Sequence, residues 1–291
     1  MNTQNDAGKS NETAAPLPVK SVDFQTAAAI RSGLKLRDVH VTYHVGGRPV
    51  HAVRGVDLDV RPGEVVGLVG ESGCGKSTLA KVICGLAEPS AGTVVYDDMP
   101  ITPMKFRRRP VELRRIQMVF QNPYASLNPR RSIRSQIEEA RAISPVEVPS
   151  VEELLNMVEL DASDADKLPH QFSGGQRQRI AIARAMAASP TLLIGDEPIA
   201  SLDASLQAKT ALLMKQAAAR TDASLLFISH DLSVVRLIAT RIVVMNKGQI
   251  VEEGPTEDIW NHPQEEYTKN LLGAIPVPDG LGHLPAFNGE I

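Results

Sequence analysis

One stretch of nine residues, 70–78, constrains the fold more than any other part of the chain. Its letters, GESGCGKST, fit the pattern G-x-x-x-x-G-K-[ST] at every fixed position. A β-branched stretch (65–69) precedes it and a helix-forming stretch (79–84) follows. Glycines let backbone N–H groups crowd a polyphosphate, and a helix N-terminus adds the positive end of its dipole. The stretch therefore predicts a phosphate-binding loop in an α/β domain with a P-loop NTPase core.

Two side chains of this loop have specific predicted roles. Lys76 is expected to place its ammonium near the β- and γ-phosphates, and Ser77 to offer its hydroxyl to Mg²⁺. An accidental Lys-Ser in a glycine-rich turn is the alternative, and the strand and helix on the flanks argue against it. The other loop residues that we expect to contact the nucleotide are Gly70, Ser72, Gly73, Cys74, Gly75 and Thr78.

Composition narrows the class of protein. Hydrophobic residues make up 43% of the 291, enough for a large core, and the net charge of −3 gives no electrostatic argument for nucleic acid. The only cysteines, Cys74 and Cys84, cannot by themselves form a metal-ligand set, which favours a reducing, cytoplasmic setting. No apolar run is long enough to span a membrane and the N-terminus lacks a secretory h-region. Work at a membrane would therefore require other chains.

The chain divides into three regions and one insertion. We interpret 1–32 as a disordered tail, 33–253 as the main domain and 254–291 as a mixed, proline-rich extension. Alternating residues on both sides of a hairpin signal at 46–48 predict an antiparallel β layer ahead of the parallel one. Proline-punctuated helical stretches over 122–170 predict an inserted helical subdomain. The basic stretch 105–115 is either a solvated turn or an anion contact.

Polar side chains end two apolar strands further along the chain. Asp196 and Glu197 follow the apolar run 191–195, and the carboxyl ends of strands face the ligand in open α/β sheets. We expect Asp196 to hold Mg²⁺ through water and Glu197 to orient the attacking water; an acidic turn without function is the alternative. His230 ends the run 224–229, and either contacts the γ-phosphate from the same edge or is structural.

Together with these motifs, the chain resembles the ATP-binding subunits of ABC transporters over residues 34–270. Tyr43 matches the aromatic residue that stacks on adenine, Gln121 the Q-loop glutamine and Asp203 the D-loop. The signature of the family is matched by Ser173, Gly174, Gly175 and Gln176. The resemblance implies the ABC ATPase fold, ATP and Mg²⁺ as cofactors, catalytic roles for Glu197, His230 and Gln121, and a metal contact from Gln121. It also implies that two such domains pair head to tail, with each ATP between the phosphate loop of one and the signature of the other.

Two further segments are similar to the oligopeptide/dipeptide importer ATPases, particularly their second subunit. They are 121–130 and the C-terminal 262–272, where Glu265-Glu266 replaces the common His-Pro. The resemblance implies an ATP-hydrolysing subunit of an importer of peptides or similar small solutes, peripheral to the cytoplasmic side of the membrane. Two permease subunits, a second ATPase subunit and an indirect link to an extracytoplasmic solute-binding protein are the expected partners; a heterodimer is favoured over a homodimer.

Two other functions compete with this interpretation. One is a soluble ABC-type ATPase that acts on nucleic acid or ribosomes. Such proteins usually carry two cassettes in one chain, or long coiled-coil or zinc insertions. This chain has one cassette and none of those insertions. The other is a non-catalytic scaffold with a degenerate site, against which the intact Lys76, Asp196, Glu197 and His230 argue. We expect no nucleic-acid partner.

Overall fold

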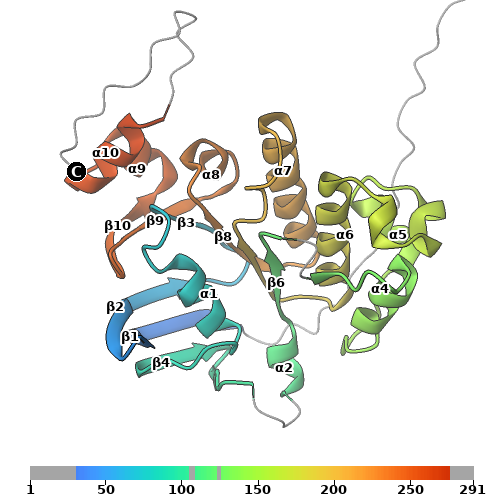
Figure 1. Ribbon diagram of the computed structural model, residues 1–291, viewed down its shortest axis with the longest axis horizontal. Coiled ribbons are helices and arrows are strands. Elements are labelled where there is room, and N and C mark those ends of the chain that lie inside the picture. The colour runs from blue at the N-terminus through green and yellow to red at the C-terminus, as the bar shows by residue number, and fades with distance from the viewer. Residues whose placement is uncertain (1–30, 105–108, 123–125, 276–291) are drawn as a thin grey trace, which may run out of the picture.

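A computed structural model describes residues 31–104, 109–122 and 126–275. Residues 1–30 of the predicted tail 1–32, residues 105–108 of the basic stretch, residues 123–125 and the segment 276–291 lie outside the described residues. Figure 1 shows an antiparallel sheet and a helical lobe at opposite ends of a central sheet that lies between them. None of the described helices is long and apolar enough to cross a membrane.

The central sheet has six strands in the order β10-β9-β3-β8-β7-β6. Strands β9, β3, β8, β7 and β6 run parallel, and β10 closes one edge antiparallel to β9. The strands are β3 (Val65–Val69), β6 (Ile116–Phe120), β7 (Leu192–Asp196), β8 (Ser224–Ser229), β9 (Arg241–Asn246) and β10 (Gln249–Pro255). Parallel strands need crossover connections, and helices supply them here over the faces of the sheet.

Both faces of this sheet are buried, as the apolar runs predict. In β8, Leu226 and Ile228 belong to one hydrophobic cluster, whereas Leu225 and Phe227 belong to the other. Successive side chains of a strand point to opposite faces, so a continuous apolar run supplies two cores. The first core lies against α1 (Lys76–Ile83), the antiparallel sheet and Leu113, and the second lies against the helices that follow residue 132.

The antiparallel layer confirms the predicted hairpin. Strands β1 (Leu34–Val45) and β2 (Arg48–Val60) pair through the turn at Gly46 and Gly47, both of which have positive φ. The four-stranded sheet has the order β2-β1-β4-β5, with β4 (Ala91–Tyr96) and β5 (Met99–Pro100). The short helix α2 (Val111–Arg114) then leads into β6.

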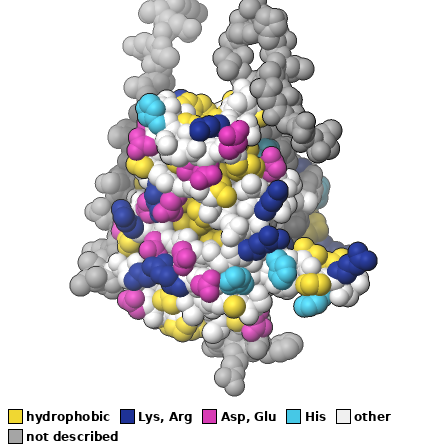
Figure 2. Space-filling model, turned by 90° about the vertical axis from the view of Figure 1, so that its left-hand side faces the viewer, with side chains coloured by type: hydrophobic (Ala, Val, Ile, Leu, Met, Phe, Trp, Pro, Cys, Tyr) yellow, Lys and Arg dark blue, Asp and Glu magenta, His cyan; other side chains and the backbone are white. Residues whose placement is uncertain are grey.

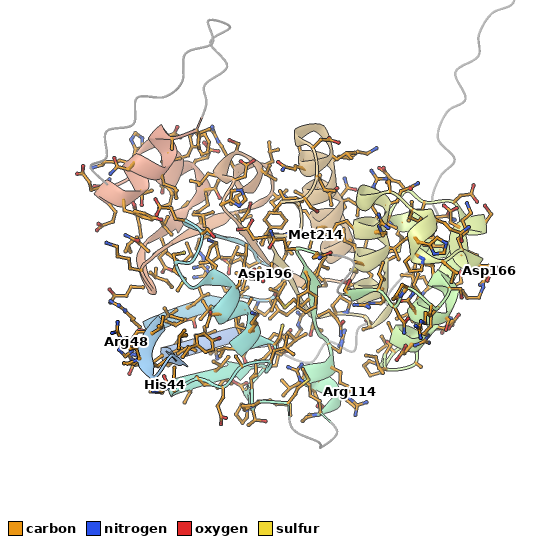
Figure 3. The ribbon with its side chains drawn as sticks, viewed as in Figure 1. His44, Arg48, Arg114, Asp166, Asp196 and Met214 are labelled. Carbon is orange, nitrogen blue, oxygen red and sulfur yellow. The ribbon has the colours of Figure 1, made fainter. Side chains whose placement is uncertain are left out.

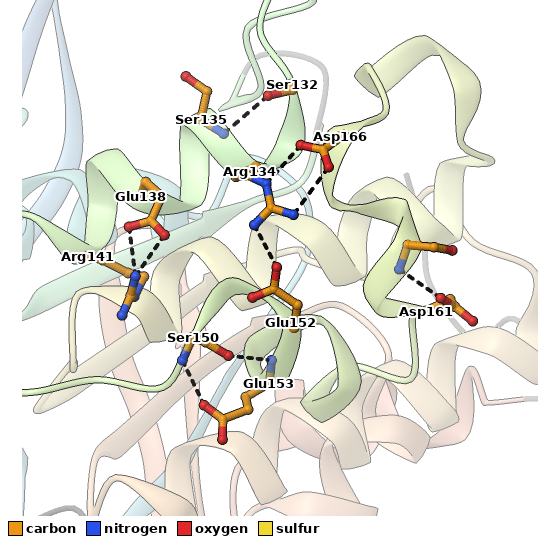
Figure 4. A network of polar contacts seen from close by, with 11 residues as sticks. Ser132, Arg134, Ser135, Glu138, Arg141, Ser150, Glu152, Glu153, Asp161 and Asp166 are labelled. Carbon is orange, nitrogen blue, oxygen red and sulfur yellow. Dashed lines mark hydrogen bonds and ion pairs between the residues drawn. The ribbon is translucent and has the colours of Figure 1, made fainter.

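Helices fill the second face and the predicted helical insertion. The insertion contains α4 (Ile133–Arg141), α5 (Val151–Met157), η1 (Ala162–Asp166) and η2 (Pro169–Gln171). It is held by Arg134, which donates to Glu152 of α5 and to Asp166 of η1, and by a capping box in which Ser150 and Glu153 start α5 (Figure 4). The second face carries α6 (Gly174–Ala187), α7 (Ala204–Arg220) and α8 (Leu232–Ile238).

The C-terminal region differs from the sequence interpretation, which named no element after Gly254. Two helices, α9 (Thr256–Asn261) and α10 (Glu266–Gly273), lie beside β10 (Figure 1). Ile259 is buried, and Trp260, Tyr267 and Leu271 pack against the second core. Helices of six and eight residues carry little periodicity, so packing rather than local pattern decides them.

Candidate nucleotide-binding site

The phosphate loop connects β3 to α1, and two of its glycines are required by close packing. A Cβ on Gly70 would lie 2.1 Å from the carbonyl oxygen of Met245, and one on Gly75 2.3 Å from that of Ala52. Both glycines also have positive φ, 147° and 114°, which side chains rarely adopt. The loop is therefore held between β2 and β9, with its backbone rather than its side chains against the neighbouring strands.

Lys76, the first residue of α1, is a buried cation that folds back over the loop. Its Nζ donates to the carbonyl oxygens of Gly70 at 2.7 Å and Glu71 at 2.8 Å, and lies 3.7 Å from the Cys74 sulfur. Within the described part of the chain it has no carboxylate partner. A buried ammonium held only by neutral acceptors suits an anionic ligand, since a phosphate would complete its compensation.

Ser77 and Asp196 meet although they come from different elements. The Ser77 hydroxyl donates to Asp196 Oδ1 at 2.7 Å, joining the start of α1 to the end of β7. Burial raises the pKa of the Asp196 carboxyl above its usual value; the Ser77 hydrogen bond opposes this effect and the nearby Glu197 charge adds to it. Asp196 lies at the centre of the molecule, far from the hairpin tip that carries His44 and Arg48 (Figure 3).

Glu197 and His230 form the second polar pair at this edge. Glu197 Oε2 and His230 Nδ1 are 2.7 Å apart; the Glu197 side chain is 13% exposed and that of His230 61%. Glu197 has a φ of 50°, in the left-handed region, and its N–H donates to Ile228 of β8 at 3.0 Å. The chain thus leaves the strand at Glu197, which presents its carboxylate to His230 while Asp196 faces Ser77.

Most of the predicted residues line one cavity of about 530 Å³. The cavity is bounded by the loop, the strand ends and α10. The predicted residues that line it are Gly70, Ser72, Gly73, Gly75, Lys76, Ser77, Thr78, Gln121, Glu197 and His230. Of the other loop and strand residues, Cys74 and Asp196 are buried behind its wall, and Asp196 reaches it through Ser77.

Three predicted elements are not part of the cavity lining. Tyr43 lies on β1, 41% exposed. The signature starts α6, where Ser173 is the N-cap: its hydroxyl accepts from the Gln176 N–H and the Gln176 side chain accepts from the Ser173 N–H. Asp203 is the N-cap of α7 and accepts from the Leu206 N–H. Ser173, Gly174 and Gln176 of the signature are exposed, and nothing lies within 4 Å of a Cβ built on Gly174, so the signature is accessible to another chain.

Three residues that line the cavity were missed by the sequence reasoning. Glu71 occupies an unspecified position of the loop pattern. Its place between Gly70 and Ser72 was therefore the one signal in the sequence that could have identified it. Ala52 of β2 and Leu271 of α10 come from elements distant in sequence. The C-terminal segment that contains Leu271 was noted for its resemblance to importer ATPases, but that similarity gave it no role.

The donor set fits a nucleoside triphosphate with a divalent cation. Gly70 and Gly75 leave the loop without side chains at two closely packed positions, so its backbone can approach a phosphate. Lys76 provides a buried positive charge, and Ser77 and Asp196 provide the oxygen ligands that Mg²⁺ prefers. Ser77 and Asp196 would hold the Mg²⁺, whose positive charge would stabilise the negative charge of the phosphates. Such a loop on a parallel sheet, with carboxylates at the end of a neighbouring strand, defines the P-loop class of nucleoside triphosphatases.

Comparisons with known proteins identify the family within this class. Residues 53–200 match the family described as ABC transporter, and the chain belongs to this family. As a member, it is an ATPase whose hydrolysis is coupled to transport.

The chain is 45% identical over 237 residues to the oligopeptide transport ATP-binding protein OppF of Bacillus subtilis (strain 168), covering 79% of this chain and 78% of that protein. It is 43% identical over 259 residues to the glutathione import ATP-binding protein GsiA of Pectobacterium atrosepticum, covering 87% of this chain but only 40% of that protein. The dimeric ATP-binding cassette MJ0796, solved with ADP and Pi, is 30% identical with a TM-score of 0.66, over 77% of this chain and 98% of the cassette.

Proposed function

We propose that this chain is the ATP-hydrolysing subunit of an importer of peptides or similar small solutes. The observation that carries the proposal is the single cavity in which Lys76, Ser77, Glu197 and His230 come together. The peptide substrate rests on the similarity to an oligopeptide transport protein at 45% identity, and a glutathione import protein among the relatives supports the wider class of small peptides.

Each of the main predicted site residues has a proposed role. Lys76 and the loop backbone bind the phosphates of ATP, and Ser77 and Asp196, with Gln121, hold Mg²⁺. Glu197 orients the attacking water and accepts its proton, since its carboxylate is at the strand edge beside the cavity. His230 fixes the Glu197 carboxylate through their 2.7 Å contact and reaches the γ-phosphate. Tyr43 stacks on the adenine.

A pair of cassettes is proposed to complete each site. The exposed signature, Ser173 to Gln176, would close over the γ-phosphate held by the partner's loop, because a serine hydroxyl and backbone N–H groups bind anions without bulk. Asp203, at the start of α7, would lie in the same interface. The dimeric state of the MJ0796 cassette is consistent with this arrangement. ATP then favours the closed pair and hydrolysis releases it.

The remaining partners follow from the importer group. Two permease subunits would bind the chain to the cytoplasmic side of the membrane through the helical region, where Gln121 links the cavity to that region. A second, different ATPase subunit would complete the pair, and a solute-binding protein would deliver substrate from outside. We take 33–253 as the ATPase domain, 122–170 as its helical subdomain and 254–291 as an extension.

The surface is consistent with a transporter subunit rather than a nucleic-acid ATPase. On the face seen in Figure 2, Lys and Arg side chains are interspersed with Asp and Glu. Proteins that bind nucleic acid usually concentrate basic residues on one face.

A pull-down tests the proposal. The tagged full-length chain is purified from detergent-solubilised membranes, and the proteins that co-purify are identified by mass spectrometry. We expect two multi-span permeases and a second, similar ATPase. Ribosomal proteins or nucleic acid without a permease would reject the importer and support the competing ATPase function.

A further inference from the structure

The C-terminal helix α10 contacts the phosphate loop directly. The Tyr267 hydroxyl accepts a hydrogen bond from the Glu71 N–H at 2.9 Å, between residues 196 apart in sequence. Leu271, four residues later and so on the same face of the helix, lines the nucleotide cavity. One face of α10 therefore forms both a polar and an apolar contact with the site.

Glu71 is the residue through which the loop holds its own shape. Its carbonyl oxygen accepts from the Lys76 Nζ at 2.8 Å and from the Cys74 N–H at 3.3 Å. Glu71 and the next two residues, Ser72 and Gly73, are exposed, so side-chain packing does little to fix this part of the loop. The hydrogen bond to Tyr267 thus restrains the residue that positions the phosphate-binding lysine.

Tyr267 is itself held in place from the opposite side. The Glu252 carboxylate of β10 accepts from the Gln264 N–H at 2.7 Å and the Glu265 N–H at 3.2 Å, just before α10 begins. Thr268, the next residue of the helix, is fully buried, and the Tyr267 ring packs against the second core. Because α10 is anchored at its start and along one face, the Tyr267 hydroxyl cannot easily move with the loop.

We propose that Tyr267 is a positioning residue for ATP binding, acting through the Glu71 backbone on the loop and on Lys76. The inference rests on the proposed function, because it deepens the account of the same site. The competing role is a structural one, in which the hydrogen bond only docks α10 and the loop keeps its geometry without it.

Tyr267→Phe removes the hydroxyl and keeps the ring. The purified full-length chain is titrated with Mg²⁺-ATP by calorimetry, and KM and kcat are measured on the transporter assembled with its partner subunits. We expect the Kd and the KM for ATP to rise about fivefold, the equivalent of one lost hydrogen bond, with kcat changed by less than about twofold. The variant should raise KM and leave kcat nearly unchanged, because the hydrogen bond stabilises the bound ground state and the transition state equally.

Tyr96→Phe is the matched control, since Tyr96 is buried in β4 and does not line the cavity. Its Kd for ATP should equal that of the parent. Thermal unfolding without nucleotide is measured for both variants. A lowered melting temperature for Tyr267→Phe with an unchanged Kd would assign Tyr267 the structural role and overturn the inference alone. A parent protein that neither binds nor hydrolyses ATP would instead overturn the proposed function, and the inference with it.

Discussion

The two carboxylates at the end of β7 are adjacent in sequence but have different surroundings. Asp196 is 8% exposed, bonded to Ser77, and has a pKa raised by burial. Glu197 adopts a φ of 50° and contacts His230 at the cavity. A non-glycine residue in the left-handed region costs about 1 kcal/mol, and such positions concentrate at functional sites. The backbone thus directs the two side chains to different partners, as the separate roles proposed for them in metal binding and water activation require.

Glu197→Gln tests this assignment at the residue scale. The variant keeps the size of the side chain but cannot accept a proton, so we expect kcat to fall by about 10²–10³ while ATP binding is retained. Phosphate release and calorimetric ATP binding are measured on the same preparation. Glu112→Gln, which neutralises an exposed carboxylate of α2, is the control. Equal ATPase rates for Glu197→Gln and the parent would exclude the role of Glu197.

At the scale of elements, the strand that carries the loop is held by tight contact with α8. A Cβ on Gly67 of β3 would lie 2.2 Å from Val235 Cγ1 and 3.3 Å from Ala239 Cβ. The glycine is required here by the close approach of a helix to the sheet, and its φ is not in the left-handed region. The position of the phosphate loop therefore depends on how closely α8 packs.

Gly67→Ala should lower the free energy of unfolding by about 2 kcal/mol, because the added methyl overpacks this contact. Adding Val235→Ala makes room for it, so the double variant should recover part of the stability relative to the sum of the two single changes. Urea unfolding of all three variants measures these differences. The packing argument is wrong if Gly67→Ala unfolds at the same urea concentration as the parent.

An ion pair joins the start of β3 to the start of β9. Arg241 Nε and Glu64 Oε1 are 2.8 Å apart, and Arg241 also donates to the Asp59 carbonyl of β2. Burial acts to raise the pKa of Glu64, but hydrogen bonds from Arg241 and the Arg61 N–H outweigh it and hold the pKa below its ordinary value. The charged carboxylate therefore contributes stability to the folded state.

This contribution predicts a pH dependence. Because the pKa of Glu64 is lower in the folded than in the unfolded chain, its stabilisation is complete above the ordinary carboxyl pKa and is lost as the pH falls through the lowered one. Glu64→Gln should cost about 2 kcal/mol at pH 7, and this difference should shrink below about pH 4. Urea unfolding of the parent and of Glu64→Gln, at pH 7 and again below about pH 4, measures the difference, and Glu112→Gln is the control. A difference that is independent of pH would contradict this account.

At the scale of the whole molecule, the proposed head-to-tail pairing requires the cassette to present half of a site on each of two surfaces. The loop, Glu197 and His230 line the cavity, whereas the signature is exposed at the start of α6, with its caps satisfied by its own side chains. The capping box of Ser173 and Gln176 already satisfies backbone N–H groups at the start of α6, so the helix needs no partner chain for its stability. Changes there should therefore affect assembly and turnover without affecting the folding of a single chain.

Gly174→Ala is expected to separate these effects. Nothing lies within 4 Å of the added Cβ, so the melting temperature and the ATP affinity of the isolated chain should not fall. In the assembled transporter the methyl would meet the partner's nucleotide, and ATPase activity should fall about tenfold or more. Gly273→Ala, at another glycine with open space around it, is the control. Full activity of assembled Gly174→Ala would argue against the head-to-tail pair.

How much could be predicted depended on how local each feature is. The loop between a strand and a helix at 70–78, the hairpin turn at 46–48 and the apolar strands of the central sheet are confirmed, because each depends on residues within about ten positions of one another. The helices α9 and α10 were not predicted. They are short, and α10 is held by contacts from β10 and the loop that no local window contains.

The sequence by itself determined the class of chemistry. The glycine spacing, Lys76 and the residues that end apolar strands are local patterns, and all of them are typical of a site that binds and hydrolyses a nucleoside triphosphate. Only the tertiary structure decided which of them meet. Ser77 and Asp196 are 119 residues apart, Glu197 and His230 are 33 apart, and Tyr267 and Glu71 are 196 apart. Parallel strands place their carboxyl ends at one edge of a sheet, but the order of the strands and the docking of α10 come from burial of the two cores, which is a property of the whole chain.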